Sequence, residues 1–232
     1  MKQVLIVMAS LLSLNAQAQK LMIGYNFSSD YNYRTLKNSD GSSSADIVIK
    51  SRNDDETARF GYTTGLNVCF GLSKHISLET GIQYSNKGYQ RKGQYTNLIP
   101  FDPSDPVKVS WVYAYQYIGI PFKAKFTFGE GKFRFIAGIG FTTSLLINYK
   151  QTATYEYADG HKEKRRSSST SGFNKIDLSP MISAGASYKL NKKIQLFAEP
   201  TFRYGLIRVK DAPVSEKLWN AGLNVGVNYV LK

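Results

Sequence analysis

The fold of this chain is decided by a stretch whose first arm reads Trp111-Val-Tyr-Ala-Tyr-Gln-Tyr-Ile-Gly-Ile-Pro-Phe-Lys-Ala-Lys-Phe-Thr-Phe128. From Val112 to Phe128 the even positions are all apolar except Gln116, whereas the odd positions include tyrosines, lysines and a threonine. Successive side chains of a strand point to opposite faces, so this alternation predicts a β-strand with one apolar and one polar face.

A second arm, Phe133–Leu146, follows the turn Gly129–Lys132 and carries its apolar residues at odd positions. Its even positions are polar or small, apart from Ile136 and Leu146. The two arms together predict a transmembrane β-hairpin, in which the apolar face contacts lipid and the polar face lines a lumen. In a soluble sandwich the same apolar face would instead form the core.

Six further segments alternate in the same way, which gives eight strands in all. They are Leu21–Phe27, Phe60–Phe70, Ile76–Tyr84, Ile176–Leu190, Ile194–Leu206 and Trp219–Leu231. The sequence therefore predicts an all-β fold, an eight-stranded antiparallel up-and-down transmembrane β-barrel. An even number of strands places both termini on the same side, and Trp219 suits the aromatic girdle at the membrane interface.

The connections between these strands alternate in length. Short turns fall at Ser73–His75, Glu130–Gly131 and Asn191–Lys193, and long polar segments at Leu36–Arg59, Arg91–Val109, Gln151–Lys175 and Val209–Lys217. This alternation is typical of outer-membrane barrels, with short periplasmic turns and long extracellular loops. The turn lengths also agree with the phase of the flanking strands, because opposed residues of a hairpin share a face.

Two long segments are expected to contain further strand. Asp159-Gly160 is a typical two-residue turn, so residues 151–157 and 161–169 are expected to continue their hairpin beyond the membrane. Residues 45–50 are expected to extend the strand that begins at Phe60, although the polar run Asn53–Asp55 should interrupt that extension.

The N-terminus has the features of an export signal. Lys2 supplies a positive charge, Val4–Leu14 is an apolar core, and Ala16-Gln-Ala18 is a small-x-small cleavage site. We expect cleavage before Gln19, which divides the chain into a signal peptide, residues 1–18, and an outer-membrane β-barrel domain, residues 19–232.

Composition restricts the class of protein further. The chain of 232 residues has a net charge of +13 and a single cysteine, Cys69, so it forms no internal disulfide. After the N-terminus, no run reaches the roughly 20 apolar residues of a membrane helix. No recognition helix or stacking platform for nucleic acid is visible, and an exported basic protein is expected to meet anionic lipid instead. Cys69 is expected to be a packed inward thiol.

Several short motifs occur in order along the chain. They are Ala16-Gln-Ala-Gln19, Tyr117-Ile-Gly-Ile-Pro-Phe-Lys123, Leu196-Phe-Ala-Glu-Pro200 and Arg203-Tyr-Gly205. Over nearly the whole mature chain, the sequence resembles the PorT-like outer-membrane β-barrel proteins of Bacteroidetes. The resemblance implies an integral outer-membrane barrel inserted by the assembly machinery, and it implies no single activity. Such barrels often end on an aromatic residue, whereas this chain ends on Lys232, so Tyr229 would have to take that role.

Charged residues occupy inward positions of the predicted barrel. They are Glu79, Lys123, Lys125, Arg134, Glu199 and Arg203. Most lie a few residues from a short turn and hence at similar depth, and an unpaired charge there would be costly. We expect a paired luminal network that fills the barrel; the alternative is a hydrated lumen in which the charges lie apart.

The densest basic patch is Lys162-Glu-Lys-Arg-Arg166. Its cations Lys162, Lys164, Arg165 and Arg166 suit a solvated loop tip. Alternatively they contact lipopolysaccharide phosphates, which arginine and lysine bind well.

No catalytic, metal or cofactor signature is visible, and the histidines are sparse. His161, Glu163 and a serine among residues 167–169 could be drawn as a hydrolytic set, but a solvated loop is the better interpretation. We therefore expect a non-enzymatic outer-membrane barrel with a structural, adhesive or assembly role. The alternatives are an outer-membrane enzyme acting on lipid A or peptides, and a soluble periplasmic lipid-binding barrel of lipocalin type. The latter needs its apolar face inward.

Overall fold

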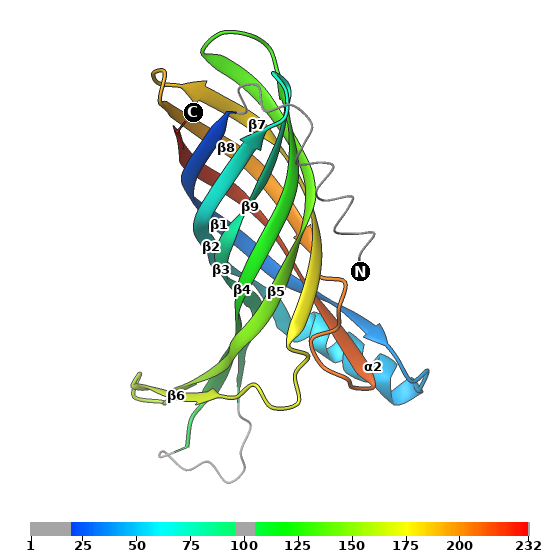
Figure 1. Ribbon diagram of the computed structural model, residues 1–232. Helices are drawn as coiled ribbons and strands as arrows, with labels where there is room; N and C mark the ends of the chain where they lie inside the picture. The colour runs from blue at the N-terminus through cyan, green and yellow to red at the C-terminus, as the bar shows by residue number, and fades with distance from the viewer. Residues whose placement is uncertain (1–19, 96–104, 232) are drawn as a thin grey trace.

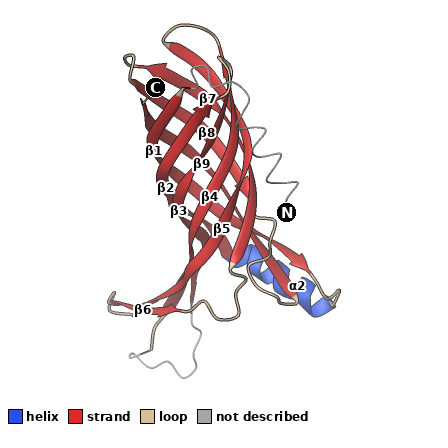
Figure 2. Cartoon of the chain, viewed as in Figure 1, coloured by secondary structure: helices blue, strands red, loops and turns tan. Residues whose placement is uncertain are grey.

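The computed structural model describes residues 20–95 and 105–231, and it shows a strand barrel with one helix at an end (Figures 1 and 2). In chain order the elements are β1 (Leu21–Asn38), α2 (Ser43–Asp55), β2 (Glu56–Gly71), β3 (Ile76–Tyr95), β4 (Lys108–Phe128), β5 (Phe133–Glu156), β6 (Lys162–Ser168), β7 (Ile176–Lys189), β8 (Ile194–Tyr204) and β9 (Val214–Val230). The predicted signal peptide, residues 1–18, lies outside the described residues.

Eight of these strands close into a ring. Each pairs antiparallel with its neighbours in the order β4-β3-β2-β1-β9-β8-β7-β5, and β4 pairs with β5 to close the circle. β6 pairs only with β5, beyond the ring. The prediction of an eight-stranded up-and-down antiparallel barrel is therefore confirmed.

The apolar face of the barrel is outward. On β4 the side chains of Ile118 and Phe122 are 45% and 49% exposed, whereas Lys123, which has the opposite phase, is 4% exposed. The inward face is polar along the other strands as well, with Asn67, Asn224 and other polar side chains buried in the lumen. An outward belt of this kind contacts lipid, and it is the opposite of the lipocalin arrangement. Among the described residues, no helix is long and apolar enough to cross a membrane.

The two ends of the barrel differ in their connections (Figure 1). The turns at residues 72–75, 129–132 and 190–193 lie at one end together with the C-terminal end of β9, and we call this the short-turn end. The backbone bonds Leu72 N to Ile76 O and Leu190 N to Ile194 O leave three residues in each loop, as the strand phases require. α2 and β6 lie at the opposite end, which we call the long-loop end.

The first long connection contains a helix, so the expected strand over residues 45–50 is wrong. Ser42 caps α2 by accepting a bond from the Ala45 amide at 3.2 Å. Asp46 lies in the first turn and Arg52 in the last, where their charges suit the helix dipole. Only Ala45 is buried in α2, so local capping and end contacts, rather than an apolar face, define this helix.

The hairpin beyond the membrane is present, but its turn is longer than the expected Asp159-Gly160 pair. Glu156 is paired with Lys162, which leaves five residues between the strands. The amide of Tyr157 donates to His161 O, and Gly160 adopts φ 82°, which favours glycine. Within the ring, odd positions of β5 are paired with even positions of β7, so the two strands share their faces as predicted.

Candidate functional site

Four buried charges cross the lumen in its short-turn half, and we call Glu79, Lys123, Lys125 and Glu199 the inner quartet. The Lys123 ammonium lies 2.8 Å from Glu79 Oε1 and 2.5 Å from Glu199 Oε1. Lys125 lies 2.6 Å from Glu79 Oε2. β3 and β4 are neighbours, whereas β8 lies across the ring, so Lys123 joins opposite walls of the barrel.

Neutral side chains occupy the remaining bonding positions of the inner quartet. Asn224 and Ser183 donate to the Glu199 carboxylate at 3.1 and 3.2 Å. The thiol of Cys69 donates to Glu79 at 3.3 Å and is fully buried, which agrees with its expected inward packing. Two lysines and two glutamates make the quartet electrically neutral, and all four side chains are buried.

The other two predicted luminal charges lie apart from the inner quartet. Arg203 lies nearer the middle of the barrel, where its Nη1 is 3.8 Å from Asp30 Oδ1. Ser28 and Thr63 donate to that Asp30 carboxylate at 2.5 and 2.6 Å. Arg134 lies at the short-turn mouth and makes a long bond, 3.4 Å, to Gly131 O. The structure thus brings together four of the six predicted residues.

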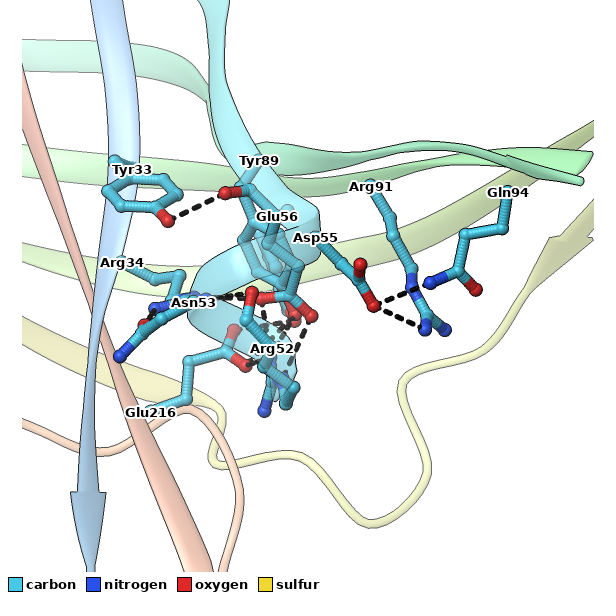
Figure 3. Close-up of polar contacts among 11 residues, drawn as sticks. Tyr33, Arg34, Arg52, Asn53, Asp55, Glu56, Tyr89, Arg91, Gln94 and Glu216 are labelled. Carbon is cyan, nitrogen blue, oxygen red and sulfur yellow. Dashed lines mark hydrogen bonds and ion pairs between the residues drawn. The ribbon is translucent and has the colours of Figure 1, made fainter. Parts of the chain in front are cut away.

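A second charged cluster closes the long-loop end, and we call Arg34, Arg52, Glu56 and Glu216 the loop-end network (Figure 3). Arg34 Nε and Arg52 Nε each lie 2.8 Å from the Glu56 carboxylate. Arg52 Nη2 lies 2.9 Å from Glu216 Oε2. The charges of its two arginines and two glutamates cancel, so this network is also neutral.

Irregularities in two strands direct side chains into this network. The β2–β3 register shifts between Ala58 and Tyr62. Thr63 and Glu56, which have opposite phase, are therefore both buried inside. A second shift, between Gln116 and Tyr117 on β4, turns Tyr149 of β5 toward Tyr115, with their rings 4.9 Å apart.

Tyrosine hydroxyls complete the loop-end network. Tyr89 and Tyr115 donate to the two oxygens of Glu216 at 3.0 and 2.9 Å. The rings of Tyr89 and Tyr115 also belong to a buried apolar cluster with Tyr117, Leu146 and Leu218. The long-loop half of the lumen thus contains a buried apolar cluster beside the charged network.

The C-terminal turn of α2 is the part of the long connections that enters the network. The Arg34 guanidinium donates to Arg52 O at 2.9 Å and to Asn53 Oδ1 at 2.6 Å. Burial opposes the charge of Arg52, but the adjacent Glu56, Tyr89 and Glu216 raise the pKa of Arg52 above its ordinary value. The C-terminal turn of α2 is thereby fixed at the barrel mouth by charge-assisted bonds.

Arg34, Glu56 and Glu216 lie in strands that extend past the predicted bounds. Glu56 and Glu216 fall in segments expected to be long loops, and Arg52 lies in a helix where a loop or strand was expected. The loop-end network was therefore not predicted. Two local signals point to the helix: Ser42 followed by Ala45-Asp46, and Arg52 four residues before Glu56. The partnership with Glu216, 164 positions away, has no local signal.

The basic patch of β6 is solvent-exposed. Lys162 and Arg165 pair with Glu156 at 3.3 Å and Glu163 at 3.0 Å. Glu163 also accepts a bond from Tyr157 at 3.1 Å. Its partners are thus Tyr157 and Arg165, and not the histidine or the serines with which a hydrolytic set could be drawn. No group of three or more metal-ligating side chains occurs in the described ranges 20–95 and 105–231.

Comparison with known proteins gives one family match. The family described as outer membrane protein beta-barrel domain matches residues 15–211. A search of the curated proteins found no match.

Three solved structures align with this chain at low sequence identity. Neisserial surface protein A is 12% identical with a TM-score of 0.48, over 92% of this chain and 99% of its own. OprG from Pseudomonas aeruginosa is 12% identical with a TM-score of 0.47, over 93% and 97%. A major outer membrane protein from Thermus thermophilus is 10% identical with a TM-score of 0.48, over 93% and 100%.

Proposed function

Because the chain belongs to the outer membrane protein β-barrel domain family, we propose that it is a closed, non-enzymatic barrel with a structural or adhesive role at the cell surface. The observation that carries this proposal is that paired charges lie inside the barrel at two depths. The inner quartet is neutral and buried, and the loop-end network is neutral with Arg52 partly exposed. An eight-stranded barrel has room for little more than its own side chains, so a wide aqueous path is not expected. The barrel then serves as an anchor that holds α2 and the β5–β6 hairpin outside the membrane.

The same proposal places the short turns in the periplasm and the long-loop end outside the cell, as the alternation of connection lengths predicts. The support for this orientation is the length of the connections at each end of the barrel. Outer-membrane barrels have short periplasmic turns, and here α2 and β6 lie together at the other end (Figure 1).

Contact with outer-leaflet phosphate is the second part of the proposal. On the outward face of β9, Leu223 is followed by Trp219 and then by Lys217 toward the long-loop end. Trp219 contacts the rings of Tyr31 and Phe202, at 6.3 and 6.0 Å, as an interfacial girdle would. Just past this girdle, a groove is lined by the cations Lys37, Lys175, Arg208 and Lys217. We call these the groove cations.

The groove cations are better placed for lipid phosphate than the basic residues of β6, which lie beyond the ring on the extended hairpin. Arg208 is paired with Asp211 at 2.8 Å, whereas the described ion pairs include no carboxylate for Lys37 or Lys217. Lysines at headgroup depth attract anionic lipid.

Conductance tests the closed-barrel proposal. The mature protein in planar bilayers should give little or no steady current. A variant with Lys123→Ala and Glu199→Ala removes one charge of each sign from the inner quartet. Its conductance should stay low, because the buried tyrosines Tyr89, Tyr115 and Tyr117 remain in the long-loop half, and it should rise only when these tyrosines are also replaced by alanine. A large steady conductance of the unmodified protein would overturn the proposal in favour of a pore.

A further inference from the structure

A small cavity opens at the short-turn mouth, between the inner quartet and the short-turn end of the barrel. Its volume is about 70 Å³, and Lys20, Lys74, Lys125, Arg134, Ser187 and Phe197 are among the residues that line it. A single water needs roughly 10–15 Å³ of such space. The cavity, which we call the vestibule, can therefore hold a group of several non-hydrogen atoms.

The vestibule has an excess of positive charge. Its described lining residues include no carboxylate, and of its cations only Lys125 is neutralised, by Glu79 of the inner quartet. The described ion pairs include none for Lys20, Lys74 or Arg134. Burial, together with the nearby charges of Lys189 and Arg134, lowers the pKa of Lys20 below its ordinary value. The cations here repel one another and lack an anion.

The wall of the vestibule contains a hydroxyl with no partner. Ser187 is 3% exposed, and its Oγ, which is buried, has no hydrogen-bond partner among the described residues. Ser187 is paired directly across the sheet with Arg134 on one side and with Phe197 on the other. Directly opposed side chains lie about 5 Å apart at Cβ, so the hydroxyl and the guanidinium can reach one atom group between them.

We propose that the vestibule binds a tetrahedral oxyanion, a phosphate that is either free or carried on a lipid headgroup of the adjoining leaflet. The guanidinium of Arg134 presents paired donors that match phosphate oxygens. The Ser187 hydroxyl donates to the same group, and Lys20 neutralises the remaining charge. Lys125 is held in place by Glu79 and by the Phe197 ring, whose centroid lies 4.8 Å from its ammonium.

This proposal is independent of whether the lumen conducts or which role the long-loop end has. Only the source of the anion depends on the side of the membrane that the short turns face. Phosphate binding and conductance are separate measurements, so failure of one proposal is distinguishable from failure of the other.

The test uses the mature full-length protein in an uncharged detergent and measures its thermal unfolding midpoint as inorganic phosphate is added. Sodium chloride at equal ionic strength is the reference, because it screens the cations without matching the donors. Phosphate should raise the midpoint saturably above the chloride value. Ser187→Ala and Arg134→Gln should each weaken the apparent phosphate affinity about tenfold. Lys164→Gln, at the other end of the molecule, is the matched control and should change nothing.

Ser187→Ala separates binding from folding. Its hydroxyl has no partner in the described structure, so the variant without phosphate should unfold at the wild-type midpoint. If Arg134→Gln does not fold, Ser187→Ala alone decides the question. No phosphate-specific rise in wild type, or an equal rise in Ser187→Ala, overturns the site for free phosphate.

Lipid nanodiscs distinguish the two sources. Discs of phosphatidylcholine, whose headgroup phosphate is balanced by its own choline cation, are compared with discs that contain phosphatidylglycerol, whose phosphate has no such counter-charge. No phosphate is present in the buffer. A midpoint raised by phosphatidylglycerol and lowered again by Ser187→Ala assigns the site to a headgroup. The proposal fails if neither phosphate source gives a rise that depends on Ser187.

Discussion

The ammonium of Lys123 lies 2.5 Å from the carboxylate of Glu199, although β4 and β8 are not neighbours in the barrel wall. A hairpin alone cannot bring these residues together, because they are 76 positions apart and on opposite sides of the lumen. Their contact exists only when the ring is closed, so the pair reports on complete barrel assembly.

Neutralising Glu199 should destabilise the folded barrel. In Glu199→Gln, two lysines share the single carboxylate of Glu79 in a buried site. Leaving a buried charge without its partner costs about 3 kcal/mol. The measurement is the unfolding midpoint in detergent or lipid, converted to a free energy of unfolding.

The matched control for this change is Glu163→Gln, which removes the same charge from the exposed β5–β6 hairpin. Solvent-exposed pairs contribute little to stability, so its midpoint should stay at the wild-type value. Equal and negligible losses in both variants would show that the lumen is hydrated and that the inner quartet does not stabilise the barrel.

Arg52→Gln should loosen α2 without unfolding the barrel. The variant loses the ion pairs of Arg52 with Glu56 and Glu216, and α2 buries only Ala45 to compensate. Amide hydrogen exchange across residues 43–55 should become faster, while exchange in the inner strands is unchanged. Arg91→Gln removes the pair with Asp55 at 2.8 Å and should accelerate exchange less, since Arg52 still holds the helix. Unchanged protection in Arg52→Gln would contradict an anchoring role.

The ring could be predicted from the sequence because its signal is local. In the hairpin from Trp111 to Leu146, each strand alternates, and the turn lengths fix the phase of each partner. α2 could not be found by the same test, because its apolar residues follow no clear stripe and Ile47 and Val48 are exposed. Ser42, which caps α2, is a sequence signal for a helix start, and a test for alternation does not use it.

The luminal charges were also only partly predictable from the sequence. Inward phase and distance from a turn predict a common depth for Glu79, Lys125, Arg134 and Glu199, and the first two and Glu199 meet in the inner quartet. Partners are set by the third dimension of the barrel, so Arg203 lies by Asp30 and Arg134 lies at the mouth. Depth follows from counting residues along a strand, but the contact between Arg203 and Asp30 and the contact between Lys123 and Glu199 do not.

Export provides a separate prediction, which concerns residues outside the described structure. The site Ala16-Gln-Ala18 follows an apolar core, so N-terminal sequencing of the protein from cell envelopes should begin at Gln19. A mature chain that still begins at Met1 would contradict the signal peptide.

Sidedness can be tested by labelling single cysteines in a Cys69→Ala background. A cysteine at Asp159, in the β5–β6 turn, should react with a membrane-impermeant reagent on intact cells. A cysteine at Lys192, in the short turn before β8, should react only after the outer membrane is opened. The reverse pattern would place the long-loop end in the periplasm.

The last prediction concerns lipopolysaccharide and compares two pairs of lysines at the long-loop end. Lys37→Gln with Lys217→Gln removes two groove cations next to the aromatic girdle, whereas Lys162→Gln with Lys164→Gln removes the same charge from β6. Each lysine at headgroup depth contributes about 1 kcal/mol to anionic lipid binding, so the groove variant should bind purified lipopolysaccharide roughly thirtyfold more weakly. The β6 variant should change affinity less than about twofold, because its cations lie on the hairpin beyond the ring and are screened by salt. Titration of lipopolysaccharide into the protein in uncharged detergent measures both. A larger loss in the β6 variant would move the phosphate contact to the hairpin, and no loss in either would exclude both surfaces.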